Sequence, residues 1–148
     1  MTIIPVIDVR GGEVVRAVGG IRSKYETLES ELCPTGDPLP LAFALHERFK
    51  CKEVYLADLD AIEGGTPNLQ LIQELVEIGM LPWVDAGVRD VADAMRIRQA
   101  GGAVVVGTET VNGGMQRAGD VCYKDLDVVN DCEFSRVYTW GGWTGRVR

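Results

Sequence analysis

The chain has 148 residues, 46% of them hydrophobic and 25% charged, which is typical of one globular domain with a single core. It is shorter than the roughly 200 residues that a complete eight-stranded β/α barrel needs, and its formal charge of -7 argues against a nucleic-acid partner. No apolar run is long enough to span a membrane and the first residues do not resemble a signal peptide, so we expect a cytoplasmic protein without a membrane partner.

The cysteines and the single histidine predict no metal site. Cys33, Cys51, Cys122 and Cys132 lack the CxxC spacing of a zinc site, and isolated thiols in a cytosolic chain are most often reduced. His46 is the only histidine, which excludes any catalytic triad or metal set that needs two. It lies in a stretch of helical character, where we expect a position on the surface.

The first predicted strand ends in a carboxylate. Four β-branched residues between positions 3 and 7 predict a strand that is apolar on both faces, as in a parallel sheet covered on each side. Asp8 follows at the end of the strand, where α/β folds place their chemistry, although it could instead cap the next turn. Gly11 and Gly12 separate this strand from a second β-rich run, EVVRAV, so we expect a hairpin.

A charged loop and a helix follow the hairpin. Residues 21–36 lack periodicity, and we expect a loop that covers one face and carries function. Asp37 and Pro38 are a good N-cap and first turn of a helix. The apolar face of that helix is expected at three residues spaced four apart, Leu41, Leu45 and Phe49.

A second β/α unit follows. The run EVYLADLD, residues 53–60, predicts a strand that leads into two carboxylates, Asp58 and Asp60. Glycines and a proline then break the chain, and residues 69–79 predict a helix that stops at Gly79.

The last two predicted strands end in small and polar residues. The run LPWVDAG predicts a strand over residues 81–87, and Asp90 can cap the helix that comes next. The buried stripe of that helix is expected to be Val91, Ala94 and Met95. The run AVVVGT, residues 103–108, predicts a fourth strand that brings Gly107 and Thr108 to the same end of the sheet as the earlier carboxylates.

Equivalent strand ends recur at a steady interval, at residues 60, 85 and 108, which favours regular right-handed crossovers. The predicted fold class is α/β, of the TIM-barrel type, with parallel β/α repeats that form only the first half of an eight-stranded barrel. We assign the half barrel, with about four strands, three helices and the hairpin, to residues 1–111, and an atypical tail to residues 112–148. A half barrel has open edges and an uncovered apolar face, so it should pair with a second half, self-associate or lean on its tail.

Four segments in this order resemble a known enzyme family: VIDVRGGEVVR, VYLADLDAIEGGTPN, VDAGVRD and VVVGTETV. They are similar to the N-terminal half of the isomerase of histidine biosynthesis that acts on a phosphoribosylformimino aminoimidazole carboxamide ribotide. The cyclase of the same pathway shares this barrel, but the hairpin and the aspartate-rich second strand look more like the isomerase. The resemblance implies a ribulose-phosphate-binding barrel that converts an aminoaldose into an aminoketose on a phosphorylated small molecule, with no metal or organic cofactor.

The resemblance also implies an acid and a base. The reaction needs an acid to open the sugar ring and a base to move a proton from the adjacent carbon. Asp8 matches the catalytic aspartate of the family's first strand, and we assign it as the base. The segment DLDVVND is similar to the fifth-strand motif, which would make Asp127 the acid, although Asp127 follows the fourth strand more closely than the repeat predicts.

The remaining residues that the resemblance assigns to the site would bind substrate or its phosphate. Backbone N–H groups and a hydroxyl at two glycine-rich strand ends would hold the phosphate. The assigned binding residues are Arg16, Asp58, Asp60, Gly87, Arg89, Gly107 and Thr108.

One departure from the family pattern keeps other functions open. The third strand usually ends in three glycines, whereas this chain has Asp85 and Ala86 before Gly87, and a carboxylate repels a phosphate unless Arg89 or another cation intervenes. The first alternative is a paralogue in another pathway that acts on a different phosphorylated or carbonyl metabolite. The second is a non-catalytic half barrel that needs a partner half.

Overall fold

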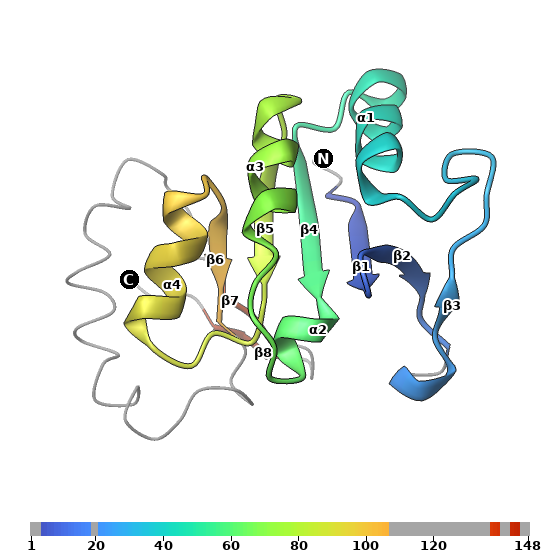
Figure 1. The fold of residues 1–148 in the computed structure, drawn as a ribbon. Helices are drawn as coiled ribbons and strands as arrows, with labels where there is room; N and C mark the ends of the chain where they lie inside the picture. The colour runs from blue at the N-terminus through green and yellow to red at the C-terminus, as the bar shows by residue number, and fades with distance from the viewer. Residues whose placement is uncertain (1–3, 19–20, 107–136, 140–142, 146–148) are drawn as a thin grey trace.

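The protein is described by a computed structural model, in which residues 4–18, 21–106, 137–139 and 143–145 are placed. A six-stranded sheet in the order β3-β2-β1-β4-β5-β6 forms its centre (Figure 1). The strands of this sheet are β1 (Val6–Arg10), β2 (Glu13–Arg16), β3 (Glu26–Thr27), β4 (Glu53–Asp58), β5 (Leu81–Asp85) and β6 (Ala103–Val105). Strands β1, β4, β5 and β6 run parallel, as the β/α repeat predicts.

The main helices lie on one face of the sheet (Figure 1). They are α1 (Pro38–Phe49), which leads from β3 to β4, and α3 (Leu69–Glu77) and α4 (Val91–Gln99), each of which connects two neighbouring parallel strands. A short helix, α2 (Leu59–Ile62), follows β4 directly. The described part of the chain therefore has the parallel β/α order of a partial barrel, which confirms the predicted fold class. Further along the chain, β7 (Val137–Thr139) and β8 (Trp143–Gly145) pair antiparallel in a separate two-stranded sheet.

Alternation along the strands explains the position of the core. In β1, Ile7 and Val9 are 1% and 3% exposed, and they face the helices, together with Leu56 of β4 and Val84 of β5. The helices contribute apolar side chains to the same cluster, among them Leu41, Ala42, Leu71, Ile72, Leu75, Ala94 and Ile97. Each fully buried Ile, Leu or Val stabilises the fold by about 1.5–3 kcal/mol relative to an exposed one.

Each long helix begins at a residue whose side chain caps it. Asp37 accepts a hydrogen bond from the Leu39 N–H at 3.0 Å, and Pro38 occupies the first helical position, as predicted. Asn68 caps α3 and Asp90 caps α4 in the same way. These caps satisfy backbone donors that a helix leaves unpaired, so they fix where each helix starts.

The hairpin predicted after the first strand is present and is extended by one strand. Strand β2 pairs antiparallel with β1, and β3 then pairs antiparallel with β2. A turn of 3-10 helix, η1 (Arg22–Lys24), lies between β2 and β3. Strand β3 and η1 both fall in residues 21–36, for which only a loop is predicted, because a two-residue strand leaves no alternating pattern in the sequence.

Three details of the predicted elements are wrong. Strand β4 ends at Asp58, and Asp60 lies in α2 instead of in the strand. Phe49 and Met95 are 60% and 54% exposed, although both are predicted on a buried helix face. Phe49 is the last residue of α1, and in α4 it is Ile97 that is buried where Met95 was expected.

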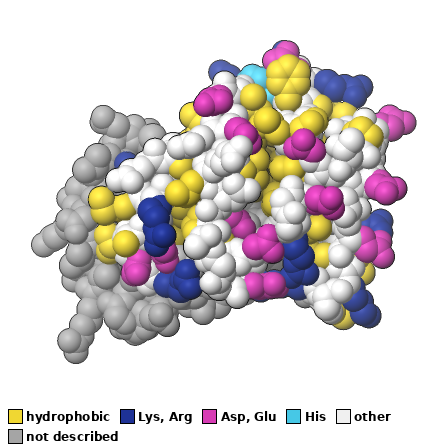
Figure 2. All heavy atoms as spheres, in the orientation of Figure 1, with side chains coloured by type: hydrophobic (Ala, Val, Ile, Leu, Met, Phe, Trp, Pro, Cys, Tyr) yellow, Lys and Arg dark blue, Asp and Glu magenta, His cyan; other side chains and the backbone are white. Residues whose placement is uncertain are grey.

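Figure 2 shows the face of the molecule that the helices cover, where apolar side chains are interspersed with both signs of charge.

Candidate functional site

Two carboxylates share one row at the carboxyl ends of the parallel strands. Asp8 of β1 pairs in register with Ala57 of β4, and Ala57 pairs in register with Asp85 of β5. Register partners in a sheet point to the same face. Since Ile7 and Val9 face the helices, Asp8 and Asp85 lie on the opposite face, which is the interior of a closed barrel. Two strand spacings place their backbones about 10 Å apart.

Asp8 lies in surroundings that suit a proton acceptor. Its side chain is half-buried, and burial raises the pKa of its carboxyl above the ordinary value of 3.8, while the positive charge of Arg22 opposes that rise. The other register partner of Asp8 is Val15, which packs with Ala57 and Leu59 in a small apolar cluster. A carboxylate with a raised pKa holds a proton more strongly, which makes it a better general base near neutral pH.

The Asp85 carboxylate accepts hydrogen bonds from two groups of the protein. The Tyr55 hydroxyl donates a hydrogen bond to Asp85 Oδ2 at 3.0 Å, and the Gly87 N–H donates a long one to Asp85 Oδ1 at 3.4 Å. Tyr55 comes from β4, two residues before Ala57 on the same face. The carboxylate is thereby held at the end of β5 by one side chain and one backbone group.

Gly87 is a glycine for reasons of packing. Its φ is +61°, and a Cβ at this position would lie 2.8 Å from the Ile62 Cα of α2. Both features favour glycine without reference to a ligand.

The Arg89 side chain is directed away from Asp85. Its Nε donates to Asp93 Oδ2 at 3.4 Å, and its terminal nitrogen donates to the Gly65 carbonyl at 3.4 Å. A phosphate beside Asp85 would need this side chain as a counter-charge.

The two carboxylates after β4 hold backbone turns. Asp58 is 5% exposed and accepts hydrogen bonds from the Ala61 N–H at 3.1 Å and the Asn68 N–H at 2.8 Å, so it caps α2 and anchors the start of α3. Asp60 Oδ2 accepts from the Gly11 N–H at 2.6 Å and fixes the turn of the hairpin. A role for either residue in substrate binding stays a prediction.

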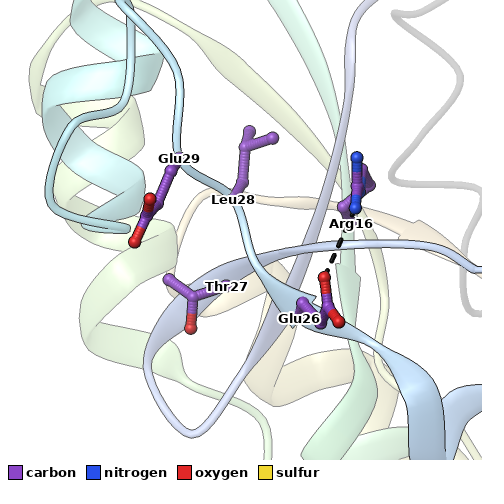
Figure 3. A pocket seen from close by; sticks show the side chains of 5 residues that line it. All are labelled: Arg16, Glu26, Thr27, Leu28 and Glu29. Atoms are coloured by element: carbon purple, nitrogen blue, oxygen red, sulfur yellow. Dashed lines mark hydrogen bonds and ion pairs between the residues drawn. The ribbon is translucent and has the colours of Figure 1, made fainter.

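Arg16 lies apart from the two carboxylates. It follows Val15, the register partner of Asp8, so strand alternation places its side chain on the other face of β2. The side chain is 66% exposed and forms an ion pair of 3.3 Å with Glu26 of β3. The pair lines an open hollow of about 460 Å³ together with Thr27, Leu28 and Glu29. Figure 3 shows how these five side chains lie.

The structure therefore brings some of the predicted residues together and separates others. Asp8 lies at the carboxyl end of β1 and Gly87 just beyond the carboxyl end of β5, with β4 between the two strands, while Gly107, Thr108 and Asp127 lie outside the described residues. Sequence reasoning did not assign Arg22 or Tyr55 to the site. For Arg22 the available signal is its place in the loop expected to carry function, and for Tyr55 it is a polar aromatic residue on the inward side of a strand.

The described residues contain neither a cluster of metal ligands nor a membrane-spanning helix. No three His, Cys, Asp or Glu side chains are grouped there as metal ligands. None of the helices in this part of the chain has the length and the apolar character needed to cross a bilayer.

Residues 2–142 match the family described as "Histidine biosynthesis protein". The chain belongs to this histidine biosynthesis family. The match starts ahead of β1 and extends past residue 111, where the half barrel was expected to end.

Curated proteins resemble the chain over about three quarters of its length. A 1-(5-phosphoribosyl)-5-((5-phosphoribosylamino)methylideneamino) imidazole-4-carboxamide isomerase of Gemmatimonas aurantiaca is 37% identical over 113 residues, which is 75% of this chain and 45% of that protein. The isomerase of the same name from Methanosarcina acetivorans is 33% identical over 112 residues, 72% of this chain and 43% of that one. An uncharacterized protein of Methanocaldococcus jannaschii is 36% identical over 114 residues, 75% and 49% of the two chains. The chain thus spans about half the length of the relatives that it matches.

Proposed function

We propose that this chain carries the base of an aldose–ketose isomerase of the histidine-biosynthesis type. The observation that carries the proposal is Asp8, a half-buried carboxylate with a raised pKa at the carboxyl edge of a parallel sheet, in a chain of the matching family. Relatives that are 33% and 37% identical are named as isomerases of a phosphoribosylated imidazole-carboxamide. A cytoplasmic location is part of this proposal.

In the proposed reaction Asp8 moves one proton. Protonation of the ring oxygen of an aminoaldose breaks its bond to the first carbon and gives an open-chain iminium. The Asp8 carboxylate then removes the proton from the second carbon, and the electron pair of that C–H bond forms the C=C bond of an enolamine. Ketonisation of the enol and protonation of the first carbon give the aminoketose. Asp127, proposed as the acid, lies outside the described residues.

Arg22 is proposed to assist Asp8. It lies close enough for its charge to lower the pKa of Asp8, and its backbone carbonyl accepts a hydrogen bond from Arg10 Nη1 at 2.6 Å, which ties η1 to the end of β1. A cation there would attract a phosphorylated substrate toward the carboxyl edge. Binding of the substrate phosphate at Gly107 and Thr108 stays a prediction.

The test of this proposal is turnover of the bis-phosphoribosyl imidazole-carboxamide by the purified chain, followed by chromatography of substrate and product. We expect activity in the unsubstituted protein and a loss of about 10²–10⁴-fold in Asp8→Asn, the range that a general base contributes. Glu31→Gln, which removes an exposed carboxylate outside the sheet, is the control and should leave the rate unchanged. An inactive unsubstituted chain, or an Asp8→Asn variant at full rate, would contradict the proposal.

Two alternatives each have an observation in their favour. Asp85 in place of a glycine favours a paralogue that acts on another phosphorylated or carbonyl metabolite. A half barrel that needs a partner is favoured by Val6, which is 65% exposed on the inward face of β1. Size-exclusion chromatography with light scattering tests the second alternative, because a half barrel that pairs should elute as a dimer or larger species.

A further inference from the structure

We propose that Asp85 determines specificity at the end of β5: it accepts a hydrogen-bond donor of the substrate, an amine or a hydroxyl, and it excludes a phosphate from that position. The inference rests on the proposed function, because it takes the carboxyl edge of the parallel strands as the substrate site. It concerns a different step, the recognition of substrate rather than proton transfer.

The position of Asp85 in the sheet is the first observation that supports this role. Asp85 stands in the same register row as Asp8, on the same face of the sheet, with only Ala57 between them. Ala57 is itself 8% exposed and packs with Val15 and Leu59, so an apolar cluster separates the two carboxylates. A ligand that contacts both carboxylates therefore has to span about 10 Å across the sheet.

The second support is the set of hydrogen bonds at Asp85. An ionised carboxylate offers about four acceptor positions. Tyr55 and Gly87 occupy two of them, at 3.0 and 3.4 Å. Acceptor positions therefore remain for donors of a ligand, while the Gly87 N–H, a group that could have held an oxyanion, is already directed at the protein's own carboxylate.

The third support is charge. Within the part of the chain that the structure describes, no Lys, Arg or His forms an ion pair with Asp85. Arg89 donates to Asp93 and to the Gly65 carbonyl instead. A phosphate dianion brought within about 5 Å of this carboxylate would meet repulsion worth about tenfold in affinity even under strong solvent screening.

The experiment is a titration of the full-length chain with inorganic phosphate, observed through the backbone amide resonance of Gly87 by NMR. Asp85→Asn keeps the shape of the side chain and removes its charge, and Asp85→Gly also frees the Gly87 N–H. We expect phosphate affinity at Gly87 to rise about tenfold in Asp85→Asn and further in Asp85→Gly, relative to the unsubstituted chain. The exposed-site control Glu31→Gln should not change it.

A second variant separates charge from the hydrogen bond. Tyr55→Phe removes the hydroxyl that donates to Asp85 and leaves the carboxylate charged, so we expect no gain in phosphate affinity. A gain in Tyr55→Phe equal to that in Asp85→Asn would overturn the inference. So would phosphate binding at Gly87 in the unsubstituted chain that matches the variants, or its absence from both Asp85 variants.

Failure of this inference and failure of the proposed isomerase give different results. The titration contains no turnover step and reads only the end of β5. If Asp8→Asn abolishes ribotide turnover but the Asp85 variants gain no phosphate affinity, the role of Asp85 is wrong and the isomerase proposal stands. If the Asp85 variants gain phosphate affinity in a chain that turns over no ribotide, the isomerase proposal is wrong and the specificity role of Asp85 stands.

Discussion

Asp8 on β1 and Asp85 on β5 flank the same residue, Ala57 on β4, in one register row of the sheet. Burial raises the pKa of the Asp8 carboxyl, whereas Asp85 accepts hydrogen bonds from Tyr55 and Gly87. Burial disfavours the charged form of a carboxylate, which is the cause of the raised pKa at Asp8. Two carboxylates in such unlike surroundings can serve different roles, one in proton transfer and one in recognition.

Asp8→Asn is expected to stabilise the fold at neutral pH while it removes activity. Because the folded-state pKa of Asp8 is raised, the unfolded chain ionises first as the pH increases above 3.8, and the folded state then holds a charge that burial disfavours. The contribution of Asp8 to the free energy of unfolding is therefore fully present below pH 3.8, and it is lost as the pH rises through the folded-state pKa. We expect a gain of about 0.5–1 kcal/mol in the free energy of unfolding at pH 7.

Urea denaturation at pH 7 and at pH 3 measures this effect. The gain in Asp8→Asn should disappear at pH 3, where both states of the unsubstituted chain are protonated at this position. Glu31→Gln again serves as the control, since its carboxylate is exposed. A gain that is equal at both pH values would assign the effect to packing of the amide and not to the buried charge.

The fold was predictable to the extent that it depends on local patterns. Caps at Asp37 and Asp90 and short β-branched runs indicated the helices and the parallel strands, because each signal lies within a few residues. The first strand was predicted to be covered on both faces, whereas Val6 is 65% exposed and only the face of Ile7 and Val9 is buried. Strand β3 was not predictable, since its two residues pair with β2 only after η1 has reversed the chain. The exposure of Met95 was missed because a stripe of small residues fits more than one helix rotation, and packing against the sheet selects Ala94 and Ile97.

The site was predictable only in part for the same reason. The place of Asp8 at the end of a strand was predictable from the β-branched run before it, while its role as a base comes from the family resemblance and stays a prediction. The contact between Tyr55 and Asp85 joins residues 30 positions apart, and it depends on the register of β4 against β5, which no pattern within either strand specifies. Asp60 illustrates the opposite case, where an acidic residue next to a strand end turns out to hold the Gly11 N–H of a neighbouring turn.

Arg22→Gln is expected to raise the pKa of Asp8 further. The guanidinium charge lowers that pKa in the unsubstituted chain, and its removal leaves the effect of burial unopposed. The hydrogen bond from Arg10 should persist, because it is accepted by the backbone carbonyl of residue 22. Carbon-detected NMR titration of the Asp8 carboxyl measures the pKa, and Lys24→Gln, in the same turn, is the control. A pKa that is unchanged in Arg22→Gln would show that η1 lies too far from Asp8 to assist it.

Asp93→Ala is expected to destabilise the protein strongly. Asp93 is 5% exposed, and its carboxylate accepts hydrogen bonds from the Arg96 side chain at 2.6 Å and from the Arg89 backbone and side chain at 3.3 and 3.4 Å. The two guanidinium groups are 43% and 49% exposed and can turn to water, but the Arg89 N–H loses its acceptor, and we expect a loss of about 2 kcal/mol in chemical denaturation. Asp90→Ala, which removes the N-cap of the same helix, should cost only about 1 kcal/mol. Equal losses in the two variants would show that Asp93 acts through helix propensity alone.

Gly87→Ala is expected to cost more stability than Gly11→Ala, and the difference isolates a steric contact. Both glycines have nearly the same φ, +61° and +59°, so both alanines pay a similar cost of about 1–2 kcal/mol for the left-handed conformation. A Cβ at Gly87 would lie 2.8 Å from the Ile62 Cα, whereas a Cβ at Gly11 would meet nothing within 4 Å. Because the clash is with backbone, α2 must shift, and we expect an additional loss of about 1–3 kcal/mol in Gly87→Ala. Thermal unfolding of the two variants side by side measures the difference, and equal losses would show that α2 moves freely away from the end of β5.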